Sequence, residues 1–136
     1  MANKFAIMGS GCIGCAVGIS LALCKYDVSF IGRKSERFDK IETRKSLSLI
    51  FPDSGSEPHV IQTENITSDE QKGLMGRNVI LIATKRTANK NIATIIARYA
   101  IDGALVIMLQ NGLNASKELL DVFKQENRED LIVLDS

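Results

Sequence analysis

A glycine-rich segment near the start of the chain has the residue types and spacing of a phosphate-binding loop. It follows an apolar run and precedes a predicted helix. Its six residues are Gly9, Ser10, Gly11, Cys12, Ile13 and Gly14. In such a loop the first glycine makes a tight turn, the second lets a pyrophosphate approach the backbone, and the third lets the helix pack closely. The helix N-terminus then faces the phosphates. We therefore predict that residues 9–14 bind a dinucleotide; the alternative is a turn that serves packing only.

The residues after the second apolar run bear on which dinucleotide is bound. NAD-preferring folds place an Asp or Glu about 20 residues after the loop, where it accepts a hydrogen bond from the ribose. This sequence has Gly32, Arg33 and Lys34 there, and no carboxylate before Glu36. A guanidinium can bind a 2′-phosphate through two hydrogen bonds, whereas an acid would repel it. Arg33 thus predicts NADP(H) rather than NAD(H); the alternative is a solvent-exposed basic pair without a role.

Polar residues follow two other apolar runs that we predict as strands. Lys85 comes shortly after the run 79–83, and Gln110 and Asn111 come directly after the run 104–109. In open α/β sheets, ligands bind at the carboxyl ends of the strands. Lys85 could contact the cofactor or orient a substrate carboxylate, and Asn111 could hydrogen-bond the nicotinamide ribose or the substrate. The alternative for each is a side chain that simply leaves a strand into solvent.

Other reactive residue types form weaker patterns. Cys12 and Cys15 make a C-x-x-C at a helix start, where the pKa of a thiol can fall, so a redox role is an alternative. Each cysteine also occupies a small-residue position of the glycine loop, which favours a packing role. The single histidine, His59, lies in a turn-rich segment with no nearby cysteine, so we expect no metal site.

Apolar runs and helical patterns alternate along the chain. Strands are predicted at residues 4–8, 28–31, 47–51, 59–62, 79–83, 104–109 and 131–134. Helices are predicted at 12–23, 35–45, 87–100 and 114–124, with a further short helix capped by Thr67 or Ser68. The order is βαβ, a hairpin-like insert, then βαβαβ. It predicts an α/β fold with a Rossmann-type doubly wound, mostly parallel sheet and a hairpin-like insert after the second strand.

The composition fits one domain over residues 1–136. The chain has 17 Lys plus Arg against 16 Asp plus Glu and is 45% hydrophobic. No basic excess is available to neutralise phosphates, so we expect no nucleic-acid binding. Three cysteines cannot form a disulfide scaffold, which indicates a reducing, cytoplasmic setting.

An uncharged stretch from Phe5 to Cys24 raises the alternative of a membrane span or export signal, but its glycines divide it into strand, turn and helix. We expect no membrane role.

Four of these features together resemble the ketopantoate reductase (2-dehydropantoate 2-reductase) family. They are the loop at 9–14, Arg33 after the second strand, Lys85 at the end of ILIATK, and Asn111 within LQNGL. The resemblance implies an NADPH site formed by Gly9–Gly14, Arg33, Lys85 and Asn111. It also implies reduction of ketopantoate to pantoate on the route to pantothenate and coenzyme A, with Lys85 and Asn111 in supporting roles near the reacting atoms.

The resemblance ends before the family's second domain. Family members continue into a helical C-terminal domain that supplies the general-acid lysine and most substrate-binding groups, and nothing in this chain matches it. Reduction of a ketone requires a proton donor near the forming alkoxide. We therefore expect turnover of a small 2-oxo acid only if a C-terminal domain is supplied. We also expect a homodimer through the face that this domain would cover, because that face should carry apolar surface.

Two alternatives stay open. One is a stand-alone, non-catalytic nucleotide-binding or regulatory module from a truncated gene. The other is an oxidoreductase of the related hydroxyacid or glycerol-phosphate type.

Overall fold

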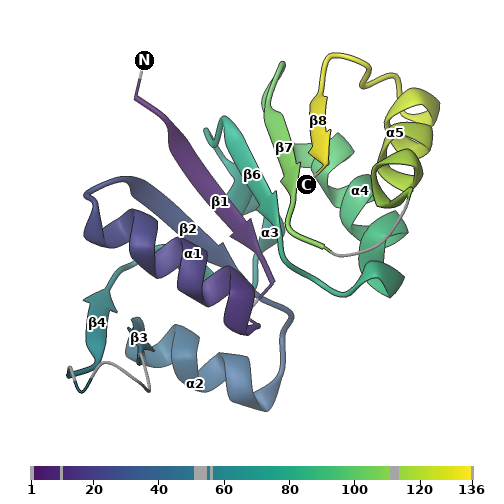
Figure 1. Cartoon of the computed structure of the whole chain (residues 1–136). Coiled ribbons are helices and arrows are strands. Elements are labelled where there is room, and N and C mark those ends of the chain that lie inside the picture. Colours follow the sequence, from purple (N-terminus) through teal and green to yellow (C-terminus); the bar gives the residue numbers. More distant parts are fainter. Residues whose placement is uncertain (1, 10, 51–54, 56, 111–113, 136) are drawn as a thin grey trace.

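A single sheet of six parallel strands forms the centre of the molecule (Figure 1). The computed structural model describes the chain except for residues 1, 10, 51–54, 56, 111–113 and 136. Among the described residues the strand order is β5-β2-β1-β6-β7-β8, so the order reverses between β1 and β6. The strands are β1 (Lys4–Met8), β2 (Asp27–Ile31), β5 (Ile66–Thr67), β6 (Val79–Ile82), β7 (Leu105–Met108) and β8 (Ile132–Asp135). This arrangement confirms the predicted Rossmann-type, doubly wound sheet.

Helices cover both faces of the sheet (Figure 1). On one face of the sheet lie α1 and α2, and on the other face lie α3, α4 and α5. The helices are α1 (Cys12–Leu23), α2 (Glu36–Arg44), α3 (Glu70–Leu74), α4 (Asn89–Tyr99) and α5 (Ala115–Gln125). A 3-10 turn, η1 (Arg86–Ala88), precedes α4.

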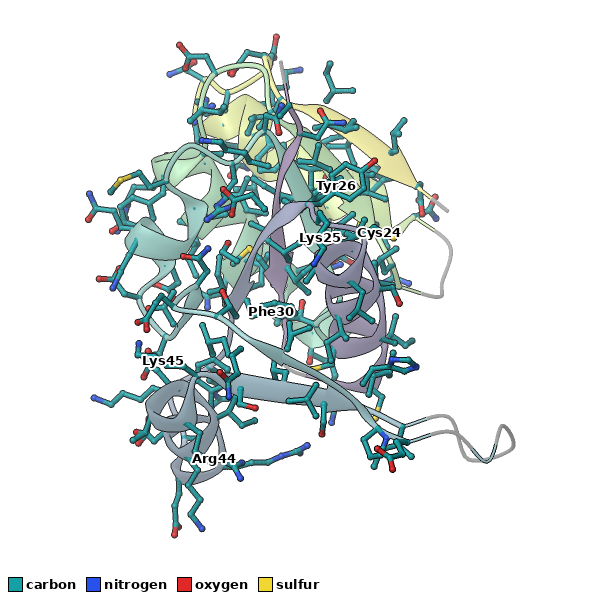
Figure 2. All side chains as sticks on the ribbon, turned by 90° about the vertical axis from the view of Figure 1, so that its left-hand side faces the viewer. Cys24, Lys25, Tyr26, Phe30, Arg44 and Lys45 are labelled. Atoms are coloured by element: carbon teal, nitrogen blue, oxygen red, sulfur yellow. The ribbon has the colours of Figure 1, made fainter. Side chains whose placement is uncertain are left out.

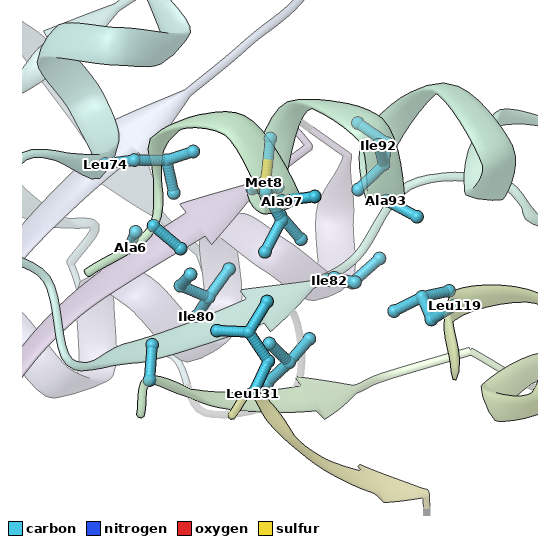
Figure 3. Close-up of a cluster of buried hydrophobic side chains, with 14 of the residues drawn as sticks. Ala6, Met8, Leu74, Ile80, Ile82, Ile92, Ala93, Ala97, Leu119 and Leu131 are labelled. Carbon is cyan, nitrogen blue, oxygen red and sulfur yellow. The ribbon is translucent and has the colours of Figure 1, made fainter. Parts of the chain in front are cut away.

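Alternate residues of each strand point to opposite faces, which gives the molecule two cores. Ala6, Met8, Ile80 and Ile82 face α4 and α5 (Figure 3). Ile7, Phe30 and Leu81 belong to the core on the α1 side, with Ile19 and Phe38 from the helices. Both faces are therefore apolar, as expected for a parallel sheet that is covered on both sides. The aliphatic runs of the sequence supply this pattern without a tryptophan.

The predicted insert is a separate antiparallel hairpin of β3 (Ser46–Leu49) and β4 (His59–Gln62). Lys45 ends α2 in a left-handed conformation with a φ of 54° and turns the chain into β3. Figure 2 shows Arg44 and Lys45 at this end of α2, apart from Lys25 and Tyr26 at the end of α1. Leu47, Leu49 and Ile61 pack against the α1-side core, so the hairpin extends that core rather than the sheet.

The segment before α3 corrects one prediction. Thr67 does not cap a helix: it lies in β5, a two-residue strand that pairs with β2 and completes the edge of the sheet. The N-cap of α3 is Asp69, whose side chain accepts a hydrogen bond from the amide of Lys72 at 3.1 Å. A two-residue strand has no readable periodicity, which explains why the sequence did not reveal it.

The start of α4 corrects a second prediction. The helix begins at Asn89 rather than Thr87, because residues 86–88 form the 3-10 turn instead. Strand β3 ends at Leu49 rather than at Phe51, and Phe51 lies outside the described residues.

The uncharged stretch from Phe5 to Cys24 forms part of β1, the glycine loop and α1. Helix α1 has 12 residues, whereas a membrane-spanning helix requires about 20. In the part of the chain that the structure describes, no helix is long and apolar enough to cross a membrane.

Candidate functional site

Gly9 brings the loop after β1 into direct contact with the end of β6. Its φ of +116° lies in the region that favours glycine. A Cβ atom on Gly9 would lie 2.9 Å from both the carbonyl carbon and the oxygen of Ala83, and 3.0 Å from the amide nitrogen of Thr84. The amide of Gly9 also donates to the carbonyl of Ile31, at the end of β2, at 2.9 Å. The ends of β2, β1 and β6 are thereby joined at the point where the strand order reverses.

Gly14 and Gly18 allow α1 to approach the sheet closely. A Cβ atom on Gly14 would lie 2.8 Å from the carbonyl oxygen of Gly9 and 3.0 Å from the Cβ of Ala83. A Cβ atom on Gly18 would lie 2.3 Å from the ring of Phe30. These contacts fix the N-terminus of α1 directly above the carboxyl ends of the strands.

Gly11 differs from the other glycines of the loop because a side chain added there would meet no other part of the chain. It is the N-cap residue of α1 with an ordinary φ of −75°, and a Cβ atom added there would meet no atom within 4 Å. Packing therefore does not explain this glycine. The first turn of α1 has no acidic residue, and its amide groups have no partner within the helix. The loop thus fits a pyrophosphate at the helix N-terminus.

Three further loop residues adjoin Gly11 in the sequence. Cys12 and Ile13 are exposed at the start of α1, Ile13 with 57% of its surface accessible. Ser10 lies outside the described residues.

The C-x-x-C pattern loses support as a redox site. Burial raises the pKa of the Cys15 thiol, the neighbouring Cys12 raises it further, and the Arg37 guanidinium opposes the rise. A raised pKa disfavours the thiolate, which is the reactive form. The same interaction reveals a residue that the sequence did not single out: Arg37, on the first turn of α2, acts electrostatically on Cys15 in α1. In the sequence, Arg37 could have been noticed because it lies only four residues after Arg33.

Arg33 comes two residues after the end of β2. Gly32 packs closely on Phe38, and its amide donates to the carbonyl of Thr67 at 3.1 Å. Arg33 and Lys34 follow as exposed residues, and Ser35 then caps α2 by accepting from the amide of Phe38 at 3.1 Å. Within the described part of the chain, the guanidinium of Arg33 has no ion-pair partner, which leaves it available to a phosphate.

Lys85 follows β6 at the same edge of the sheet. It is exposed and precedes the 3-10 turn, where its carbonyl accepts from the amide of Ala88 at 3.0 Å. Asn111 lies outside the described residues, but Gln110 before it is buried. The structure therefore brings together the glycine loop, Arg33 and Lys85 at the carboxyl ends of β1, β2 and β6.

Metal chemistry finds no support in the described residues. No group of three or more His, Cys, Asp or Glu side chains among them could hold a metal ion.

Comparison with known proteins identifies the family. The sequence profile described as ketopantoate reductase PanE/ApbA matches residues 5–133, which is nearly the whole chain. The chain belongs to the ketopantoate reductase PanE/ApbA family. The match includes both halves of the sheet, the hairpin and all the described site residues.

Relatives with different names share this fold. A PanE/ApbA family ketopantoate reductase from Ralstonia eutropha JMP134 superposes with a TM-score of 0.77 at 26% identity, over 97% of this chain and 40% of that one. A glycerol-3-phosphate dehydrogenase [NAD(P)+] from Bacillus anthracis is 26% identical over 96% of this chain and 38% of that protein. Octopine dehydrogenase in complex with NADH and agmatine reaches a TM-score of 0.78 at 17% identity, over 97% of this chain and 34% of that one, which shows the fold alone. The chain thus spans about two fifths or less of the length of these relatives.

The loop geometry generates a paired prediction for two glycine variants. We expect Gly9→Ala to lower the free energy of unfolding by about 1–3 kcal/mol, because the new methyl group meets the backbone of Ala83 at a positive φ. We expect Gly11→Ala to change it by less than about 0.5 kcal/mol, because the methyl group enters open space. Urea unfolding of the two variants measures both values. Equal stability of the two proteins would contradict the proposed contact between the loop and β6.

Proposed function

We propose that the chain binds NADP(H) and forms the nucleotide-binding part of a ketopantoate reductase-like oxidoreductase. The observation that carries this proposal is the glycine loop itself, which closes against β6 while the backbone at Gly11 remains open at the N-terminus of α1. Family membership supports the same function. In doubly wound folds dinucleotides bind at the carboxyl ends of the strands where the strand order reverses, and the glycine loop follows β1 at this reversal.

Arg33 supports the choice of NADP(H) over NAD(H). Arg33 and Lys34 follow the end of β2 as exposed residues, and Arg37 lies on the first turn of α2, where it acts electrostatically on Cys15. These three cations would attract a 2′-phosphate, and Arg33 can bind it through two hydrogen bonds. Relatives do not decide between the cofactors: the Bacillus anthracis protein is named for NAD(P)+, and the octopine dehydrogenase complex contains NADH.

Lys85 and Asn111 are proposed to act at the nicotinamide end of the site. A bound reduced nicotinamide supplies a hydride to the carbonyl carbon of a 2-oxo acid. The ammonium group of Lys85 would hold the cofactor or the substrate carboxylate by charge, and the amide of Asn111 would orient the nicotinamide ribose or the substrate. We propose 2-dehydropantoate as the substrate and pantothenate biosynthesis in the cytoplasm as the context. The proton donor would come from the helical domain that the resemblance implies.

A second candidate is a nucleotide-binding or regulatory module that acts without turnover. Both candidates predict that the chain binds NADPH. They differ in ketopantoate-dependent NADPH oxidation. If the chain is part of an enzyme, this oxidation should appear when a helical-domain chain is added, and if it is a module without turnover it should not. A third candidate, reduction of a glycerol-phosphate-type substrate, rests on the similarity to glycerol-3-phosphate dehydrogenase.

The cofactor proposal predicts a selective effect of Arg33→Ala. We expect this variant to bind NADPH about 10- to 100-fold more weakly, the loss expected for hydrogen bonds to a charged group, and NADH with unchanged affinity. Titration followed by nicotinamide fluorescence measures both constants. Lys40→Ala, which removes an exposed positive charge from the following helix α2, is the matched control and should bind NADPH like the wild type. Equal or tighter binding of NADH by the wild-type protein would overturn the preference for NADP(H).

We further propose that the chain self-associates through one face of β7 and β8. Leu105 and Ile107 of β7 lie on the α1 side of the sheet beside Ile132 and Leu134 of β8. Ile132 and Leu134 are 55% and 49% exposed, and β8 is the edge strand of the sheet among the described residues. An exposed apolar face of this kind is suited to docking on the same face of a second copy.

Sedimentation velocity tests this association. We expect a dimer at concentrations of tens of micromolar, on the order of the affinity of small interfaces. Leu134→Lys should yield a monomer because it places a charge within the apolar face. A wild-type protein that sediments as a monomer would refute the dimer.

A further inference from the structure

A buried pair of amide side chains joins the ends of β6 and β7. Gln110 follows β7 and is 7% exposed, and Asn89, the first residue of α4, is completely buried. The Nε2 group of Gln110 donates to the carbonyl of Thr84 at 2.7 Å and to Oδ1 of Asn89 at 2.8 Å. The function proposed above assigns no role to either amide.

The orientation of both amides is determined by these bonds. The carbonyl of Thr84 can only accept, so Gln110 must present its NH2 group there, and Oδ1 of Asn89 must face the same group. Both hydrogens of that NH2 group are therefore used. No side chain without two adjacent donors could replace Gln110 at this position.

The two residues that accept these hydrogen bonds lie on either side of Lys85 in the sequence. Thr84 precedes Lys85 directly, and Asn89 lies four residues after it, beyond the 3-10 turn. The carbonyl of Lys85 also accepts from the amide of Ala88 at 3.0 Å. Gln110 thus holds the backbone of Thr84 before Lys85 and the side chain of Asn89 after it, while the Lys85 side chain itself remains exposed at the candidate site.

Stability alone does not explain this amide pair. Nδ2 of Asn89, Oε1 of Gln110 and Oγ1 of Thr84 are buried and make no hydrogen bond to a described residue. Buried polar groups are normally satisfied, and apolar residues of similar size would pack here without that cost. The arrangement instead provides a fixed, directional connection between two strand ends.

We propose that Gln110, together with Asn89, is a positioning residue for Lys85. It holds the connection from β6 to α4 so that the Lys85 ammonium lies at the nicotinamide end of the site. This inference rests on the proposed function. It requires that the adenosine end of the site, at the glycine loop and Arg33, does not depend on Gln110.

Two ligands separate positioning from a general effect on folding. NADPH occupies both ends of the site, whereas 2′,5′-ADP occupies only the adenosine end. We expect Gln110→Met, which conserves length and removes both donors, to bind NADPH about tenfold more weakly, the loss of about one hydrogen bond to a charged group. Its affinity for 2′,5′-ADP should remain within about twofold of the wild-type value. Gln71→Met, at an exposed position on α3, is the matched control and should bind both ligands normally.

A double-mutant cycle tests whether Gln110 acts through Lys85. Lys85→Met should weaken NADPH binding by itself, and Gln110→Met should then add less than about threefold, because coupled residues are not additive. If Gln110→Met does not fold, Asn89→Leu removes one of the two bonds and should give a smaller loss in the same direction.

Three outcomes overturn the inference. An equal loss of both ligands by the Gln110 variant would indicate a merely structural role. Unchanged NADPH binding would indicate no role, and a full tenfold loss in the Lys85→Met background would show that Gln110 does not act through Lys85. If the wild-type protein binds neither NADPH nor 2′,5′-ADP, the proposed function itself fails.

Discussion

The site depends on the contact between the backbone of Gly9 and the end of β6. A Cβ atom at Gly9 would come within 3.0 Å of three backbone atoms of Ala83 and Thr84, so only glycine at a positive φ can bring the two connections together. This contact determines where α1 begins, because Gly14 packs on Gly9 itself. It also brings the glycine loop, at Gly9, against the start of the connection that carries Lys85. The two halves of the sheet, far apart in sequence, thereby share one site at the reversal of strand order.

The sequence predicted the features that have a local pattern. The glycine spacing and the aliphatic runs 79–83 and 104–109 predicted the loop, the parallel strands and the doubly wound fold, and α1 was predicted with its observed bounds. Two kinds of feature were missed. Strand β5 has only two residues, so it depends on pairing with β2 rather than on a pattern of its own. The hydrogen bonds of Gln110 join positions 21 and 26 residues away, and such contacts exist only after the strands have assembled.

In the candidate site, too, the residues with a local sequence pattern were predicted and those that depend on the folded chain were missed. Arg33 and Lys85 were predicted because each follows a recognisable strand, and both lie at the expected edge of the sheet. Arg37 was missed because a charged residue on the first turn of an amphipathic helix is normally a solvent-exposed residue; only the folded chain places it near Cys15. The family fixes the fold, while relatives with other names share it. The fold alone therefore does not decide cofactor or substrate preference.

The central claim is that NADPH binds along the glycine loop and reaches across the strand reversal to Lys85. An amide-resolved NMR titration of the chain with NADPH tests it directly. We predict chemical-shift changes at the amides of Gly11, Cys12 and Ile13 and, across the reversal, at Thr84 and Lys85, while Val60 in the β3–β4 hairpin remains unchanged. Loop amides that do not respond to saturating NADPH, or changes confined to elements away from the carboxyl ends of β1, β2 and β6, would contradict this account.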